Sequence, residues 1–221
     1  MNTFDAEREE ICRVGRSLFA RGYVHATAGN ISVRLPEGQG YLITPTDACL
    51  GTLRPEQLAH TDTVGAQLDG PPASKTLALH RAIYAAEPAA QCVLHTHSTQ
   101  LVALTLAGVW SAASVLPPIT PYFVMKVGPV PLITYRRPGD PAVAALVAEA
   151  IVAARQRGAP IRAVMLDRLG PNVWHESLAA ASAVLEELEE TAHLWLLTQR
   201  RAEPLSDAQI DELRGAFDAR W

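Results

Sequence analysis

Two hydrophobic periods alternate along the chain, and they indicate which segments are helices and which are strands. Apolar residues recur at a spacing of three to four positions in several segments, which predicts helices with one buried face. The expected helices cover residues 4–21, 76–86, 98–107, 140–156 and 178–199, and a last one begins after Ser206. Ser206 and Gln209 form a capping box, the pattern that typically starts a helix.

Shorter segments have the strict alternation or the continuous apolar character of β-strands. Residues 31–35 alternate, and residues 41–43 follow them after a turn rich in glycine, which predicts a β-hairpin. Further strand candidates are residues 92–95, 123–127, 130–133 and 163–166. Helices and strands that alternate beside a hairpin predict a mixed sheet covered by helices on both faces. Neither an internal repeat nor a long linker interrupts this pattern, so we expect one domain over residues 1–221.

Composition narrows the class of protein. The chain is 48% hydrophobic and 19% charged, as expected of a globular interior and not of a disordered tail. A net charge of −4 without a basic stripe argues against nucleic acid as a partner. The apolar stretches are shorter than the roughly 20 residues of a membrane span, and residues 1–10 lack the apolar core of a signal peptide. Three widely spaced cysteines (Cys12, Cys49 and Cys92) without a CxxC motif indicate reduced thiols, and we expect a cytoplasmic protein.

The sequence His95-Thr96-His97 stands at the end of a predicted strand. Residues i and i+2 of a strand point to the same face, so both imidazoles can bind one divalent metal ion. Imidazole suits Zn²⁺ and its first-row neighbours. An isolated pair of this kind is more often two histidines in ordinary hydrogen bonds, so the metal interpretation depends on the surrounding sequence.

That surrounding sequence has a recognisable order of motifs: Gly29-Asn30, Thr44-Pro45-Thr46, Ser74-Lys75, His80 and then His95-Thr96-His97. This order resembles the class II aldolase family, which includes L-fuculose-1-phosphate aldolase, and the resemblance extends from about residue 8 to about residue 200. Residues 120–128, 135–140 and 185–192 are most similar to its 3-oxo-tetronate 4-phosphate decarboxylase branch. The resemblance implies a three-layer α/β/α sandwich with a central mixed, largely antiparallel sheet. It also implies a homotetramer with active sites at subunit interfaces.

The resemblance also assigns roles to individual residues. His95 and His97 would hold a divalent metal, with Zn²⁺ favoured. From its own chemistry, and not from the resemblance, the cation Lys75 is also a candidate for catalysis, as an electron sink at a substrate ketone. Tyr122 would serve as a proton donor from a neighbouring subunit. The phosphate of a small sugar acid phosphate would bind the set Gly29, Asn30, Thr46, Ser74 and Lys75. Turn amides, small hydroxyls and a cation are groups that suit a phosphate dianion, although each of these residues alone is as easily an ordinary turn or surface residue.

Three positions depart from the family pattern. Leu169 stands where a third metal-binding histidine is usual, and Asp167 or His175 would have to compensate. Thr76 replaces a glutamate that serves as general acid and base. Asp47 adds a carboxylate beside the expected phosphate turn. We interpret the acidic run 186–190 as a solvated helix face or a subunit contact.

Thr76 bears most directly on the reaction. Aldol cleavage requires a base to remove a hydroxyl proton, whereas a β-keto acid loses CO₂ from a carboxylate that is already ionised at neutral pH. The sequence therefore favours a metal-dependent carbon–carbon lyase that decarboxylates a 3-oxo sugar acid phosphate to a ketose phosphate. A class II aldolase that uses another base is the first alternative. A non-catalytic, adducin-like interaction module is the second.

Overall fold

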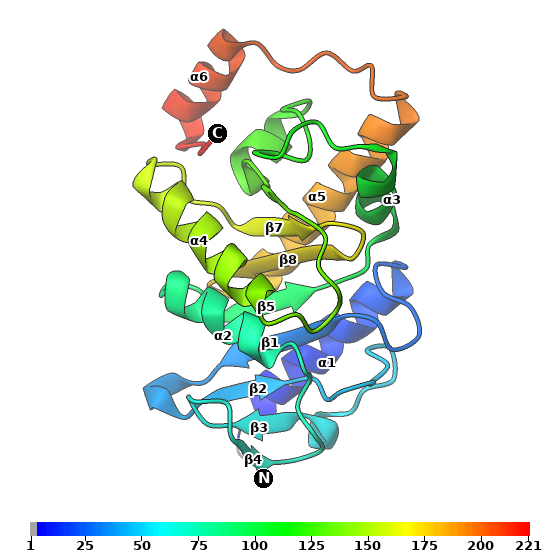
Figure 1. The fold of residues 1–221 in the computed structure, drawn as a ribbon, viewed down its shortest axis with the longest axis vertical. Coiled ribbons are helices and arrows are strands. Elements are labelled where there is room, and N and C mark those ends of the chain that lie inside the picture. The colour runs from blue at the N-terminus through cyan, green and yellow to red at the C-terminus, as the bar shows by residue number, and fades with distance from the viewer. Residues whose placement is uncertain (1–3) are drawn as a thin grey trace.

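The computed structural model describes residues 4–221, and its strands form one eight-stranded sheet in the order β4-β3-β2-β1-β5-β8-β7-β6 (Figure 1). The strands are β1 (Asn30–Arg34), β2 (Tyr41–Ile43), β3 (Ala59–Thr61), β4 (Gln67–Asp69), β5 (Cys92–His95), β6 (Leu132–Ile133), β7 (Ala163–Leu166) and β8 (Gly170–His175). Neighbouring strands are antiparallel except β6 and β7, which are parallel. The sheet is therefore mixed and largely antiparallel, as expected.

Helices cover both faces of this sheet. They are α1 (Asp5–Ala20), α2 (Leu77–Ala86), α3 (Thr99–Ala107), α4 (Ala142–Gln156), α5 (Leu178–Leu197) and α6 (Asp207–Phe217). Figure 1 shows α2 and α4 in front of the sheet and α1 and α5 behind it. One apolar core joins α1, α3 and α5 to one face, and a second core joins α2 and α4 to the other. These layers confirm the three-layer α/β/α sandwich. None of the helices within residues 4–221 is long and apolar enough to cross a membrane.

The six helices that the hydrophobic period predicts are all present, and so is the hairpin of β1 and β2. The prediction of a strand at residues 123–127 is wrong, because Phe123–Val127 is a π-helix (η3). Phe123 packs into the core around α5, whereas Val124 packs against α6, so the segment is apolar because it is enclosed from both sides. Only Leu132–Ile133 of the candidate strand 130–133 pairs in the sheet.

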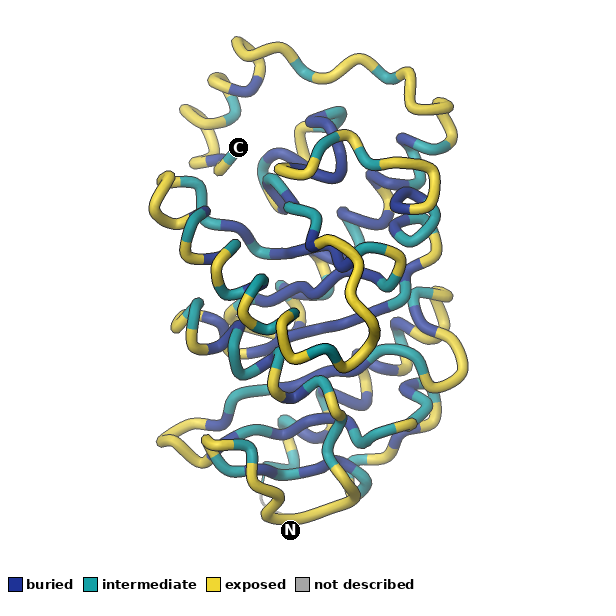
Figure 2. The backbone as a smooth tube through the Cα atoms, viewed as in Figure 1, coloured by how far each residue is buried: buried dark blue, intermediate teal, exposed yellow. Residues whose placement is uncertain are grey.

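The sequence analysis does not predict three of the strands, β3, β4 and β8. β3 and β4 are short, and every residue of β4 is exposed, so they have no apolar period to detect. β8 begins with Gly170 and Pro171, two residues that usually argue against a strand. Figure 2 shows the central strands as the buried part of the chain, with the segment after β6 exposed in front of them.

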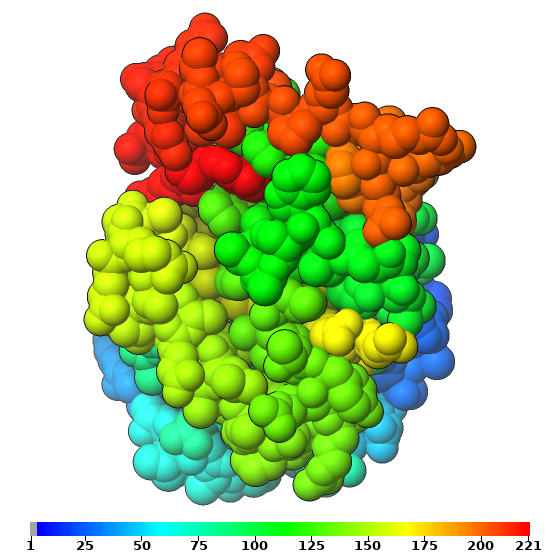
Figure 3. Space-filling model, turned by 45° about the horizontal axis from the view of Figure 1, so that its top comes forward, coloured from blue at the N-terminus to red at the C-terminus, as the bar shows by residue number. Residues whose placement is uncertain are grey.

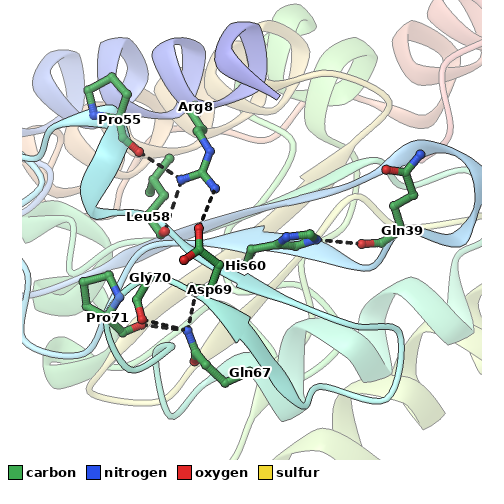
Figure 4. A network of polar contacts seen from close by, with 9 residues as sticks. All are labelled: Arg8, Gln39, Pro55, Leu58, His60, Gln67, Asp69, Gly70 and Pro71. Atoms are coloured by element: carbon green, nitrogen blue, oxygen red, sulfur yellow. Dashed lines mark hydrogen bonds and ion pairs between the residues drawn. The ribbon is translucent and has the colours of Figure 1, made fainter. Parts of the chain in front are cut away.

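A buried arginine ties α1 to the β3–β4 edge of the sheet (Figure 4). Arg8 is only 4% exposed, and its guanidinium donates hydrogen bonds to the carbonyls of Pro55 (3.1 Å) and Leu58 (3.2 Å). It also lies 4.0 Å from the exposed carboxylate of Asp69 on β4. A guanidinium is suited to this place because its fixed fork of donors satisfies several acceptors at once.

Replacing Arg8 with methionine is expected to lower the free energy of unfolding by about 2 kcal/mol, because the buried carbonyl of Leu58 and the partly buried carbonyl of Pro55 lose their donor. Urea unfolding at constant protein concentration measures this change. Arg13→Met, on the exposed side of the same helix, is the matched control, since surface pairs such as Arg13–Glu10 contribute little. Equal stability of the two variants would contradict the role assigned to Arg8.

One carboxylate of the acidic run 186–190 has a structural role. Glu189 is buried, and its carboxylate accepts hydrogen bonds from the backbone N–H groups of Gln100 (2.8 Å) and Leu101 (3.1 Å). It therefore caps the N-terminus of α3, the helix that begins two residues after His97. The interpretation of the whole run as a solvated face is thus wrong for Glu189. This cap fixes the end of the segment that carries both histidines.

Candidate active site

Three polar side chains lie side by side across the middle of the sheet, on the face that α2 and α4 cover. Asn30 of β1 and Asn172 of β8 are both the register partners of His95 on β5. All three are buried. Gly29 allows this close approach, because its φ is +84° and a Cβ there would lie 2.8 Å from the His95 carbonyl oxygen. The turn before β1 thus places Asn30 directly beside His95.

The two histidines have the separation that a shared metal requires. His95 Nδ1 lies 2.9 Å from the Pro171 carbonyl oxygen, which makes Nδ1 the protonated nitrogen and leaves the lone pair on Nε2. The ring centroids of His95 and His97 are 5.1 Å apart. Two imidazoles on one tetrahedral Zn²⁺, with Zn–N bonds near 2 Å, would have their centroids about 5 Å apart. The pair therefore fits two positions of such a site.

Both imidazoles are kept neutral, which is the state that binds a metal. Burial, with a smaller effect of His97 and against the hydrogen bond to Pro171, lowers the pKa of His95 to about 4. Burial also lowers the pKa of His97, and His25 acts in the same direction. At neutral pH neither ring has to lose a proton before it binds a cation.

Behind His95 lies a buried hydrogen-bonded chain that links α2 to the sheet. Ser32 Oγ is 2.7 Å from His80 Nδ1 and 2.8 Å from the Tyr84 hydroxyl. Burial, with a smaller effect of His95, lowers the pKa of His80 to about 3. The ring of His80 is fully enclosed and lies outside the cavity wall, so it can position the site but cannot bind a metal in the cavity.

The buried, neutral His80 predicts that acid destabilises the metal-free protein. The unfolded chain takes up a proton at this side chain below about pH 6.5, while the folded state does not until about pH 3. The contribution of His80 is therefore complete above pH 6.5 and falls as the pH decreases, by about 2 kcal/mol at pH 5.

Urea unfolding of wild type and His80→Gln at pH 8 and pH 5, in the presence of a chelator, tests this expectation. His95 contributes to both proteins, so the difference between their pH dependences isolates His80. The same loss of stability between pH 8 and pH 5 in both proteins would refute it.

Two loops form the part of the site expected to bind phosphate. Thr46 N donates to Pro72 O (3.0 Å), Thr46 Oγ1 donates to Ala73 O (2.9 Å) and Ser74 N donates to Thr44 O (3.2 Å). Ser74 Oγ and Thr76 Oγ1 are 2.9 Å apart just before α2 begins at Leu77. The hydroxyls of Thr46 and Ser74 therefore lie at the N-terminus of a helix, where backbone N–H groups and the helix dipole favour an anion.

A cavity of about 550 Å³ joins these parts. Its wall includes the predicted residues Gly29, Asn30, Thr46, Ser74, Lys75, His95 and His97. Tyr122 is not in the wall: it is 62% exposed and precedes η3, which packs against α5 and α6. The structure of one chain therefore brings together all of the predicted site residues except Tyr122.

Sequence reasoning missed two cationic side chains that also line the cavity. Arg136 and Arg137 line the cavity from the exposed segment between β6 and α4. The green to yellow-green atoms of residues 130–150 extend across the face shown in Figure 3. The paired arginines were a usable signal, because guanidinium groups bind carboxylate and phosphate in a bidentate manner.

The structure also separates the candidates for a third metal ligand. Leu169 and Asp167 both line the cavity, but leucine has no donor atom. His175 pairs with Cys92, three residues along β5 from His95, so it lies about 10 Å away at the far end of the strand. The suggestion that His175 compensates for Leu169 is therefore wrong.

Asp47 also lines the cavity, and its backbone has a φ of +57°. No ion pair joins its carboxylate to Lys75 in the described structure, residues 4–221.

Comparison with known proteins agrees with the geometry. Residues 9–196 match the model of the class II aldolase and adducin N-terminal domain. The chain is 55% identical to a 3-oxo-tetronate 4-phosphate decarboxylase of Cupriavidus necator, over 100% of both chains, and 41% identical to one of Escherichia coli, over 94% of both. The crystal structure of YgbL from Escherichia coli, described as an aldolase, epimerase or decarboxylase, superposes with a TM-score of 0.86 at 41% identity, covering 95% of this chain and 98% of YgbL. L-fuculose 1-phosphate aldolase shares the fold alone, with a TM-score of 0.80 at 22% identity, over 99% and 98% of the two chains. The chain belongs to the class II aldolase and adducin family.

Proposed function

We propose that this protein is a metal-dependent carbon–carbon lyase that decarboxylates a 3-oxo sugar acid phosphate of the 3-oxo-tetronate 4-phosphate type. The observation that carries the proposal is the cavity itself, in which a pair of neutral imidazoles shares one space with an anion-binding helix N-terminus and three cationic side chains. Such a substrate has a ketone between two anionic ends. The named activity of relatives that are 41–55% identical supports the same choice.

Binding comes first in the proposed mechanism. The phosphate would accept hydrogen bonds from Ser74 and the N-terminal amides of α2, and from Thr46 once its hydroxyl turns away from Ala73 O. Lys75 would neutralise part of the phosphate charge. Arg136 and Arg137, from the segment between β6 and α4, add positive charge to the cavity wall and would attract the substrate's second anionic group. Asn30, fixed beside His95, has a side-chain oxygen that finds no hydrogen-bond partner within residues 4–221 and would orient a hydroxyl of the substrate.

The reaction then breaks the bond between C1 and C2. The electron pair of this bond moves toward the ketone at C3, CO₂ leaves, and a proton returns to C2. By atom count, a four-carbon 3-oxo acid 4-phosphate gives dihydroxyacetone phosphate. A divalent metal held by His95 and His97 would supply the Lewis acid that stabilises negative charge on the ketone oxygen. Lys75 contributes positive charge to the same cavity.

Thr76 favours decarboxylation over aldol cleavage. Its hydroxyl lies 2.9 Å from Ser74 Oγ, so it belongs to the anion-binding end of the cavity and cannot act as a carboxylate base. Aldol cleavage is the second candidate, because Asp47, Asp140 and Asp167 also line the cavity and a carboxylate can serve as the base. Decarboxylation needs none of these carboxylates.

Tyr122 and the tetramer remain part of the proposal. An exposed tyrosine next to a π-helix is available to a second subunit, where its hydroxyl would deliver the proton to C2. Assembly into a homotetramer with active sites between subunits would bring Tyr122 to the cavity of a neighbour. Sedimentation velocity of the purified protein measures the oligomeric state directly.

The activity is tested with purified protein, Zn²⁺ or Mn²⁺, and freshly prepared 3-oxo-tetronate 4-phosphate. We expect release of CO₂ and dihydroxyacetone phosphate in equal amounts, each followed by a coupled assay. L-fuculose 1-phosphate, offered in parallel, reports aldol cleavage. Cleavage of that sugar phosphate without CO₂ release from the keto acid would overturn decarboxylation in favour of the aldolase.

A further inference from the structure

His25 is a second imidazole neighbour of His97 that the sequence motifs do not include. It lies in the turn between α1 and β1, with its ring centroid 6.3 Å from that of His97 and the two rings nearly perpendicular (76°). Thr27, Ala28, Gly29 and Asn30, which follow it in the same turn, all line the cavity. His97 is therefore close to two imidazoles, that of His95 and that of His25.

The proposed metal site lacks one protein ligand. Catalytic zinc sites usually have three protein ligands and leave the fourth position to water or substrate. Leu169 cannot contribute, His175 lies at the far end of β8, and His80 is enclosed behind the cavity, which leaves the cavity-lining carboxylate of Asp167 and the nearby imidazole of His25. Within residues 4–221, no three His, Cys, Asp or Glu side chains are already gathered for a metal. A third ligand has to come from a side chain that can move.

His25 lies beside His97 but outside the wall of the cavity, so its side chain has to turn inward to become that ligand. Its centroid distance to His97, 6.3 Å, exceeds by about 1 Å the separation expected for two imidazoles on one tetrahedral ion. The side chain of His25 is exposed, so it can change rotamer without disturbing the core. The backbone of the turn is anchored on both sides, by buried Val24 before it and buried Asn30 after it.

From this arrangement we infer that His25 is the third protein ligand of the divalent metal, in the role that Leu169 cannot fill. The inference rests on the metal site proposed for His95 and His97. The turn of residues 24–30 would then have two functions, since Gly29 and Asn30 line the substrate cavity while His25 binds the metal. Metal binding would then hold this turn in place before substrate arrives.

Metal affinity tests the inference without an activity assay. The dissociation constants of Zn²⁺ and Co²⁺ are measured by competition with a chromophoric chelator for wild type, His25→Ala and His193→Ala. His193 lies on α5, on the opposite face of the sheet, and is the matched control. The visible absorption of bound Co²⁺ reports its coordination number and geometry, and it shifts when one ligand is replaced by water. Because His25 is exposed, the fold of His25→Ala is expected to survive, and circular dichroism checks this.

We expect His25→Ala to weaken both metals by more than the roughly 10- to 100-fold loss that follows removal of an outer partner of a ligand. The Co²⁺ spectrum should change as well, while His193→Ala retains wild-type affinity and spectrum. A smaller loss, or an unchanged Co²⁺ spectrum, would overturn the ligand role and leave the site at His95 and His97 intact. A wild-type protein that binds neither metal would overturn this inference together with the metal-dependent function.

Discussion

Replacing His97 with alanine is expected to remove the bound metal and to reduce decarboxylation at least about 1000-fold, which corresponds to about 4 kcal/mol of transition-state stabilisation. His97 is the better choice than His95 for this test. His95 is buried and donates a hydrogen bond to Pro171 O, so its loss also damages the fold. His97 is only partly buried, and its side chain faces the cavity. Elemental analysis of the protein and the coupled CO₂ assay measure the two effects on the same sample.

The two measurements separate the possible explanations. Loss of metal with full turnover would show that the reaction does not use the metal, and the proposed mechanism would be wrong. Retained metal with lost turnover would indicate that His97 contacts the substrate instead. His193→Ala, which should retain metal and activity, controls for the loss of an imidazole. If wild type itself contains no metal, cannot be loaded and shows no turnover, an adducin-like interaction module becomes the better interpretation.

The parts of the site that sequence reasoning found are those encoded by local patterns. His95 and His97 follow a strand at a spacing of two, and Ser74-Lys75 precedes a helix, so each pair is positioned by its own element. The alternation of periods similarly gave all six helices and the hairpin. A single sequence is sufficient for such features because the backbone period alone decides which side chains share a face.

The parts that sequence reasoning missed depend on contacts between distant elements. Asn172 lies beside His95 because β8 pairs antiparallel with β5, and nothing in its own neighbourhood predicts that register. His25 and His97 are 72 residues apart along the chain, and Glu189 caps a helix 88 residues before it. The error at Phe123–Val127 has the same origin. Because α5 and α6 enclose that segment from two sides, its sequence is mostly apolar and shows no helical period.

Replacing Lys75 with methionine is expected to lower kcat/KM about 100-fold, mainly by raising KM. Methionine keeps much of the length of the side chain but loses the ammonium group. A hydrogen bond to a charged partner contributes about 1.5–3 kcal/mol, and about 2.7 kcal/mol corresponds to this factor. Lys75 is exposed at the N-terminus of α2 and lines the cavity, so the fold should be unaffected. Steady-state kinetics with the keto acid phosphate, and thermal unfolding of both proteins, provide the measurements.

Lys126→Met is the matched control, because Lys126 lies in η3 and does not line the cavity. It removes the same charge from the protein and should leave KM unchanged, so an effect specific to Lys75 cannot come from net charge. The division between kcat and KM then locates the ammonium group. A raised KM with little change in kcat places it on the phosphate, since uniform binding of substrate and transition state affects KM alone. A loss confined to kcat would place Lys75 near the ketone, where it would stabilise charge that develops only as CO₂ leaves.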